Sequence, residues 1–119
     1  MAYIPVLTVT AVLAFTAGCR QQKAAHGPDA VLRKLYDEYK FGQIEKCEWR
    51  KSVVYHAGIN AFDAGSQVYD ERGKPIGVCN YMTNMVDSVC GQLSDCDVIY
   101  RCDKHISGEP PVNKLGLAE

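Results

Sequence analysis

The cysteines leave this chain few ways to fold. The sequence has six of them in 119 residues, and four lie within the stretch 79–102. So many cysteines in a short chain are typical of exported proteins, in which disulfides form and supplement a small hydrophobic core. We therefore expect a disulfide-stapled domain from an oxidising compartment, with the 79–102 stretch as its cross-linked centre.

The start of the chain predicts export. The first 18 residues carry no charged side chain and are mostly apolar. Their apolar run is too short for a membrane-spanning helix, which takes about 20 residues, but it has the length of a signal-peptide core. The run ends in Thr16-Ala17-Gly18-Cys19, and polar residues follow directly.

This junction resembles the lipobox of bacterial lipoproteins, which places small residues just before a cysteine that becomes the lipidated N-terminus. Ala17, Gly18 and Cys19 match that pattern. The resemblance implies a signal peptide at 1–18, acylation of Cys19 by fatty acids such as palmitate, and a polar tether over 19–27. A basic residue after the cysteine implies the periplasmic side of the outer membrane, if the cell is Gram-negative. Plain secretion and a retained membrane anchor are the alternatives.

Residues 28–103 have the patterns of one globular domain. Apolar residues recur at helical spacing from Pro28 to the glycine at position 42, which predicts an N-terminal helix. Alternating patterns rich in β-branched and aromatic residues predict four short antiparallel strands, and Gly73 predicts a bulged hairpin turn between the last two. These strands are expected at 43–50, 52–59, 67–69 and 74–79.

A second helix and a last strand are expected in the cysteine-rich stretch. Thr83 or Asn84 is a suitable N-cap, and a second apolar stripe has helical spacing. Alternation then predicts a strand at 97–102, and residues 104–119 are expected to form a C-terminal tail. The expected fold class is therefore α+β, with the first helix packed on a short-stranded antiparallel sheet, and a mostly β sandwich is the alternative. The second stripe consists of Met82, Val86, Val89, Cys90 and Leu93.

If Cys19 carries lipid, an odd number of cysteines remains for disulfides. Two disulfides and one free thiol are then the simplest state, and spacing alone does not fix the pairing. We expect Cys96 to pair with Cys79 or Cys90. We expect the other disulfide to join Cys47 to Cys102 across neighbouring strands.

Several function classes find no support in the sequence. The net charge of -1 provides no basic face for nucleic acid. The cysteines lack the close pairs of a zinc site, and the acidic turn at 70–73 lacks the spacing of a calcium loop. No nucleophile elbow, phosphate-binding loop or metal-binding motif is present. We therefore expect no cofactor, no metal and no enzymatic activity.

The remaining features favour a lipid-anchored cell-envelope protein that binds another envelope protein. The expected edge strand at 74–79 or the loop at 60–66 would make the contact, the loop in the manner of an inhibitor. A structural tether or spacer is an alternative. A small envelope hydrolase is another, and it would need His56, Asp63, Asp87 or a free cysteine in one pocket. His56 itself is predicted to be structural, because spacing places no serine, cysteine or carboxylate beside it.

Overall fold

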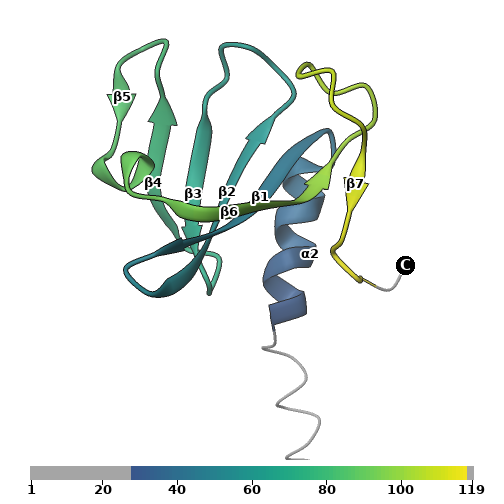
Figure 1. Ribbon diagram of the computed structural model, residues 1–119, viewed down its shortest axis with the longest axis horizontal. Coiled ribbons are helices and arrows are strands. Elements are labelled where there is room, and N and C mark those ends of the chain that lie inside the picture. The colour runs from purple at the N-terminus through teal and green to yellow at the C-terminus, as the bar shows by residue number, and fades with distance from the viewer. Residues whose placement is uncertain (1–27, 118–119) are drawn as a thin grey trace, which may run out of the picture.

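The computed structural model describes residues 28–117, which form one antiparallel sheet with a helix against it (Figure 1). The seven strands lie in the order β5-β4-β3-β2-β1-β6-β7. The expected α+β class with two helices is wrong, because the sheet dominates, and all the strands belong to one sheet rather than to a sandwich. The elements are α2 (Pro28–Tyr39), β1 (Gly42–Trp49), β2 (Ser52–Ile59), β3 (Ser66–Asp70), β4 (Pro75–Asn80), β5 (Met85–Val86), the 3-10 helix η1 (Ser88–Gly91), β6 (Ser94–Arg101) and β7 (Val112–Asn113).

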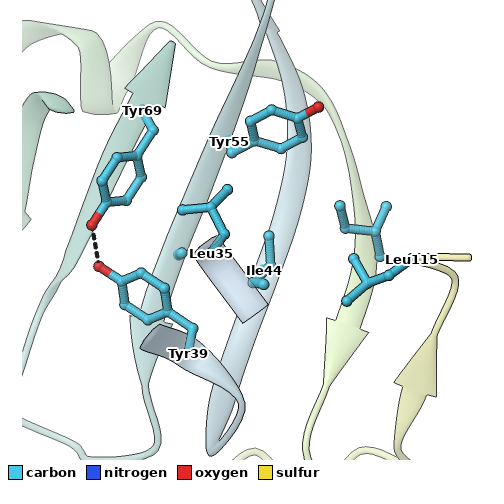
Figure 2. Packing of buried hydrophobic residues seen from close by; sticks show 8 residues of the cluster. Leu35, Tyr39, Ile44, Tyr55, Tyr69 and Leu115 are labelled. Carbon is cyan, nitrogen blue, oxygen red and sulfur yellow. Dashed lines mark hydrogen bonds between the residues drawn. The ribbon is translucent and has the colours of Figure 1, made fainter. Parts of the chain in front are cut away.

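The first helix and its packing are confirmed. The apolar stripe of α2 lies on one face of the sheet, where Leu35 and Tyr39 pack against Ile44 of β1 and Tyr55 of β2 (Figure 2). The helix stops at Tyr39, and Gly42 opens β1 instead of capping the helix. A side chain at Gly42 would overlap the backbone of β2, since its Cβ would lie 2.0 Å from the carbonyl oxygen of Gly58.

The buried residues form two clusters, one on each face of the sheet. The helix-side cluster comprises Leu35, Tyr39, Ile44, Tyr55, Ala57, Tyr69, Ile99 and Leu115. The opposite cluster comprises Cys47, Val54, Val68, Cys79 and Val89, and its cover comes from the segment around η1 together with Trp49. Trp49 is held there by a hydrogen bond from its indole N–H to Gln92. Strand β2 therefore buries alternate residues on both faces, as a central strand does.

The second helix expected over residues 82–93 does not form. Asn84 has a left-handed backbone (φ 60°), which a right-handed helix cannot accommodate. Met85–Val86 pairs with β4 instead, and Asp87 is extended (φ -71°, ψ 155°). The amide of Asp87 donates to the carbonyl of Val78, and its carboxylate accepts from the amide of Val78. These bonds to β4 outweigh the helical periodicity, and one short 3-10 turn remains.

The described part of the chain contains two disulfides and one free thiol, as the odd number of cysteines predicts, but the predicted pairing is wrong. The bonds are Cys47–Cys96 and Cys79–Cys90, and Cys102 is free and buried. The reason is the strand order. Because β6 lies beside β1, Cys96 comes close to Cys47, with a Cα–Cα distance of 4.0 Å. The amide of Cys102 instead bonds to Gly42, five residues along β1 from Cys47, or about 17 Å.

The bulged turn between β3 and β4 is confirmed. Gly73 has φ 84°, and its amide donates to the carbonyl of Asp70. The Asp70 carboxylate accepts the amides of Arg72 and Lys74, which fixes the loop. The pairing of β3 with β4 shifts by one residue beside this turn, which is the expected bulge.

Part of the segment expected as a C-terminal tail is packed. Val112–Asn113 forms β7 on the outer edge of β6, and the amide of Lys114 donates to the carbonyl of Ile99. Leu115 is buried in the helix-side cluster. This segment therefore extends the sheet beside β6 and adds Leu115 to the cluster beneath α2.

None of the helices within residues 28–117 has the length and apolar character needed to cross a membrane. The lipobox-like residues and the predicted signal peptide lie outside the described residues.

Candidate functional site

One end of the sheet gathers four chain connections. The pairs Gly42 with Ile59, Gln43 with Arg101 and Ser66 with Cys79 all lie at this end. The antiparallel pairing therefore brings together the α2–β1 turn, the β2–β3 loop, the β4–β5 turn and the segment after β6. Figure 1 shows them at the top of the view, with the start of α2 at the bottom.

The connections at this end are joined to one another. The side chain of Asn60, in the β2–β3 loop, donates to the carbonyl of Lys104 and accepts the amide of Ile106. On the other side of the same loop, Gly65 lies against Asn80, so that a Cβ at Gly65 would be 2.9 Å from the Cβ of Asn80. Neighbouring loops at this end therefore contact one another and do not project separately.

The surface at this end carries several exposed apolar side chains. Phe62 is 86% exposed, Met82 is 75% exposed and Phe41 is 74% exposed, although they come from three different connections. Every large hydrophobic side chain that is exposed within residues 28–117 lies here or on the adjacent strand β5. Exposed apolar side chains gathered at one end of a domain are typical of interaction surfaces. We name it the apolar end, consisting of Phe41, Ile59, Phe62, Tyr81, Met82 and Ile106.

A line of polar side chains runs across three strands beneath the apolar end. His56 of β2 lies between Glu45 of β1 and Ser66 of β3. Its Nδ1 is 2.9 Å from Glu45 Oε1, and its Nε2 is 2.6 Å from Ser66 Oγ. The side chains of His56 and Glu45 are 27% and 23% exposed. Ser66 Oγ also lies 3.4 Å from the carbonyl oxygen of Cys79, which is a longer contact.

These polar groups line a cavity of about 130 Å³ together with Ile59, His105 and Ile106. The Nδ1 atom of His105 accepts the backbone amide of Ser107 at 3.2 Å. In the neutral ring the proton therefore lies on Nε2, which makes that nitrogen a donor. The cavity thus combines the hydrogen-bonded series Glu45–His56–Ser66 with the imidazole of His105 and an apolar rim.

The structure separates most of the residues that a hydrolase was expected to need. Asp63 is exposed in the β2–β3 loop, Asp87 is bound to β4, and Cys102 is buried at the end of β6. The structure does not bring these groups to His56. The partners of His56 are instead Glu45 and Ser66, which spacing along the sequence did not single out.

A signal for one of these partners was nevertheless present. A two-residue turn at positions 50 and 51 places residues whose numbers sum to 101 opposite each other, and Glu45 and His56 are such a pair. Ser66 could not be found this way, because the β2–β3 loop has no fixed length that the sequence reveals. Within the described residues, no group of three or more His, Cys, Asp or Glu side chains could hold a metal ion.

The expected docking edge on β4 is already occupied. Val78, in the middle of that strand, has its amide and its carbonyl bonded to Asp87, and β5 pairs with the residues that follow. A partner strand cannot add to this edge without displacing them, so the β4 edge does not serve as the contact surface. The loop expected at 60–66 ends where β3 begins at Ser66, and it contributes the exposed Phe62 to the apolar end.

No protein-family model matches the chain, and no curated protein and no solved structure matches it either.

Proposed function

We propose that this chain is a lipid-anchored envelope protein that binds another envelope protein through the apolar end. The observation that carries this proposal is the gathering of exposed apolar side chains from four separate connections at one end of the sheet. Exposed apolar area of this kind lowers the solubility of a protein, and it typically marks a surface that a partner covers.

The position of the proposed anchor fits this role. Helix α2 has 12 residues and is therefore about 18 Å long, and it begins at the end of the sheet opposite the apolar end. A lipid on Cys19 would be followed by the tether and then by that far end of the domain. The apolar end would then be directed away from the membrane that holds the lipid.

The chemistry of the surface favours a protein as the occupant. Aromatic residues and methionine are enriched at the centres of protein interfaces, and Phe41, Phe62, Tyr81 and Met82 are of these types. Charges of both signs surround them, with Lys40 and Lys104 among the cations and Asp63 and Asp103 among the anions. A partner with an apolar centre and a rim of mixed charge would complement this surface.

Site-specific photo-crosslinking in the host cell tests the proposal. A photoreactive amino acid at position 62 is expected to capture one defined envelope protein, whereas the same amino acid at position 72, on the opposite turn, is not. The double variant Phe62→Ser/Met82→Ser should weaken capture from a photoreactive group at position 106 by tenfold or more. Equal capture from positions 62 and 72 would argue for the alternative role as a spacer without a specific contact.

Mass spectrometry of the mature protein from the same cells tests the anchor separately. The expected mass corresponds to a chain that begins at Cys19 and carries acyl groups, with four of the other cysteines oxidised. A mature chain that lacks acyl groups would remove the membrane anchor from the proposal but would leave the contact surface intact.

A further inference from the structure

We propose that Ser66, His56 and Glu45 form an acyl-transfer centre that hydrolyses carboxylic esters with a short acyl chain. In this centre Ser66 is the nucleophile and His56 is the general base. Glu45 is a positioning residue that acts through His56. The proposal goes beyond the binding function, because it assigns a reaction to the polar line beneath the apolar end.

The contacts of His56 match these roles atom by atom. With Glu45 Oε1 2.9 Å from Nδ1, the proton of the neutral ring is held on Nδ1 and donated to the carboxylate. The other nitrogen, Nε2, then carries a lone pair directed at Ser66 Oγ at 2.6 Å, which lies within the range for a nucleophile and its base. This order of acid, imidazole and hydroxyl defines a triad by geometry rather than by position in the sequence.

The sheet holds the three groups firmly in place. Glu45 and His56 are directly paired residues on β1 and β2, and His56 is paired with Val68 on β3, two residues from Ser66 on the same face. Groups on neighbouring strands keep their separation better than groups on loops. Ser66 itself follows Gly65, whose left-handed backbone (φ 71°) ends the β2–β3 loop at the rim of the cavity.

The cavity limits the class of substrate. Its volume of about 130 Å³ and its apolar residues Ile59 and Ile106 suit a short acyl group. The alcohol portion of the ester would extend over the apolar end. His105 lines the same cavity with a donor at Nε2, and we assign to it the hydrogen bond to the carbonyl oxygen as negative charge develops there.

The reaction proceeds in two balanced steps. First, Ser66 Oγ bonds to the carbonyl carbon while its proton passes to His56 Nε2. The bond from that carbon to the alcohol oxygen then breaks, and the proton leaves with the alcohol. In the second step, water gives a proton to Nε2 and its oxygen bonds to the acyl carbon. Ser66 takes the proton back as the carboxylic acid departs.

Labelling with a fluorophosphonate, which modifies nucleophilic serines, tests the centre in the folded full-length chain. Peptide mass spectrometry should find the label on Ser66 and not on Ser52, an exposed serine at the far end of β2. His56→Gln should slow labelling by about a hundredfold or more, since a positioned base contributes that much. Absence of label on Ser66, or equal labelling of the His56→Gln variant, would overturn the proposal.

Hydrolysis of p-nitrophenyl acetate and p-nitrophenyl octanoate tests the substrate class. The acetate should be the better substrate, and activity should vanish in Ser66→Ala but remain in Ser52→Ala. Glu45→Gln should lower kcat with little change in KM, and Glu45→Asp should restore part of the loss, which a merely structural carboxylate would not do. A faster reaction with the octanoate, or full activity in Ser66→Ala, would rule out this site. Ser66→Ala should abolish the esterase activity but keep capture of the partner by a photoreactive amino acid at position 62, which separates this proposal from the binding function.

Discussion

At the scale of single residues, Gly77 shows how closely η1 is fitted to the sheet. A Cβ at position 77 would lie 2.3 Å from Cγ1 of Val89, which is buried in the cluster opposite the helix. Gly77→Ala is therefore expected to lower the free energy of unfolding by about 1–3 kcal/mol through overpacking. Gly91→Ala is the matched control, because a Cβ at position 91 meets nothing within 4 Å. Urea denaturation of the two variants measures the difference.

Gly77 and Val89 together provide an internal check on this prediction. If the cost arises from Val89, then Gly77→Ala combined with Val89→Ala should cost less than the two single changes added together. If the two costs in unfolding free energy are additive, Gly77 is needed for its backbone conformation and not to avoid overlap with the side chain of Val89.

The buried tyrosines predict sensitivity to alkaline pH. Desolvation by burial raises the pKa of Tyr39 far above its ordinary value, and the hydrogen bond to Tyr69 adds to this effect. Burial likewise raises the pKa of Tyr55 and of Tyr69. The unfolded chain releases these protons near pH 10, whereas the folded chain retains them. Stability is therefore fully present below about pH 10 and declines as the pH rises further.

The variant Tyr39→Phe isolates the contribution of one phenolic proton to the pH dependence of stability. The variant should be less stable at neutral pH, because it loses the hydrogen bond to Tyr69, but its unfolding free energy should fall less steeply above pH 10. The slope should differ by about 1.4 kcal/mol per pH unit, the value for one proton. Denaturant titrations at a series of alkaline pH values measure both slopes, and identical slopes would contradict a retained proton on Tyr39.

At the scale of elements, local patterns predicted the first helix and most of the strands. The stripe of α2 agrees with the tertiary packing, because the helix buries the face that its own sequence makes apolar, and the strand content of β1 and β2 is as predicted, although these strands bury residues on both faces. The stretch 82–93 shows the opposite case. Its helical periodicity was real, but Met82 and Val86 are exposed, and pairing with β4 together with the disulfide at Cys90 decides the structure.

The two disulfides should differ in their effect on stability. Cys47–Cys96 closes a loop of 49 residues, whereas Cys79–Cys90 closes one of 11. Loop-closure entropy gives about 4 kcal/mol for the longer loop and about 2.8 kcal/mol for the shorter. Replacing Cys47 and Cys96 by alanine should therefore cost about 1.3 kcal/mol more than replacing Cys79 and Cys90, as measured by urea denaturation.

Cys102→Ala is the control for the loss of a buried sulfur without a bond. It should cost less than either disulfide. If removal of Cys79–Cys90 proved the more damaging, the attachment of η1 to β4 would matter more than the constraint on the unfolded chain.

At the scale of the whole molecule, the strand order turns scattered residues into surfaces. The odd number of cysteines left after Cys19 indicated two disulfides and one free thiol. Which cysteines pair could be found only by knowing that β6 lies beside β1. The contact of His56 with Ser66 and the apolar end likewise join residues that no single tight turn brings together. These were beyond reach from the sequence, because propensity and periodicity describe each element alone, whereas Glu45 could be placed beside His56 from the β1–β2 turn.

Both disulfides contribute to the cluster opposite the helix, and the cluster beneath α2 contains no cysteine. The two sides of the sheet are therefore maintained by different means, the helix side by non-covalent packing and the other side by packing together with covalent bonds. A shortage of oxidant during maturation would weaken the side bearing η1 first and leave the helical side largely assembled. The incompletely oxidised molecule would then carry its additional free thiols on the side bearing η1.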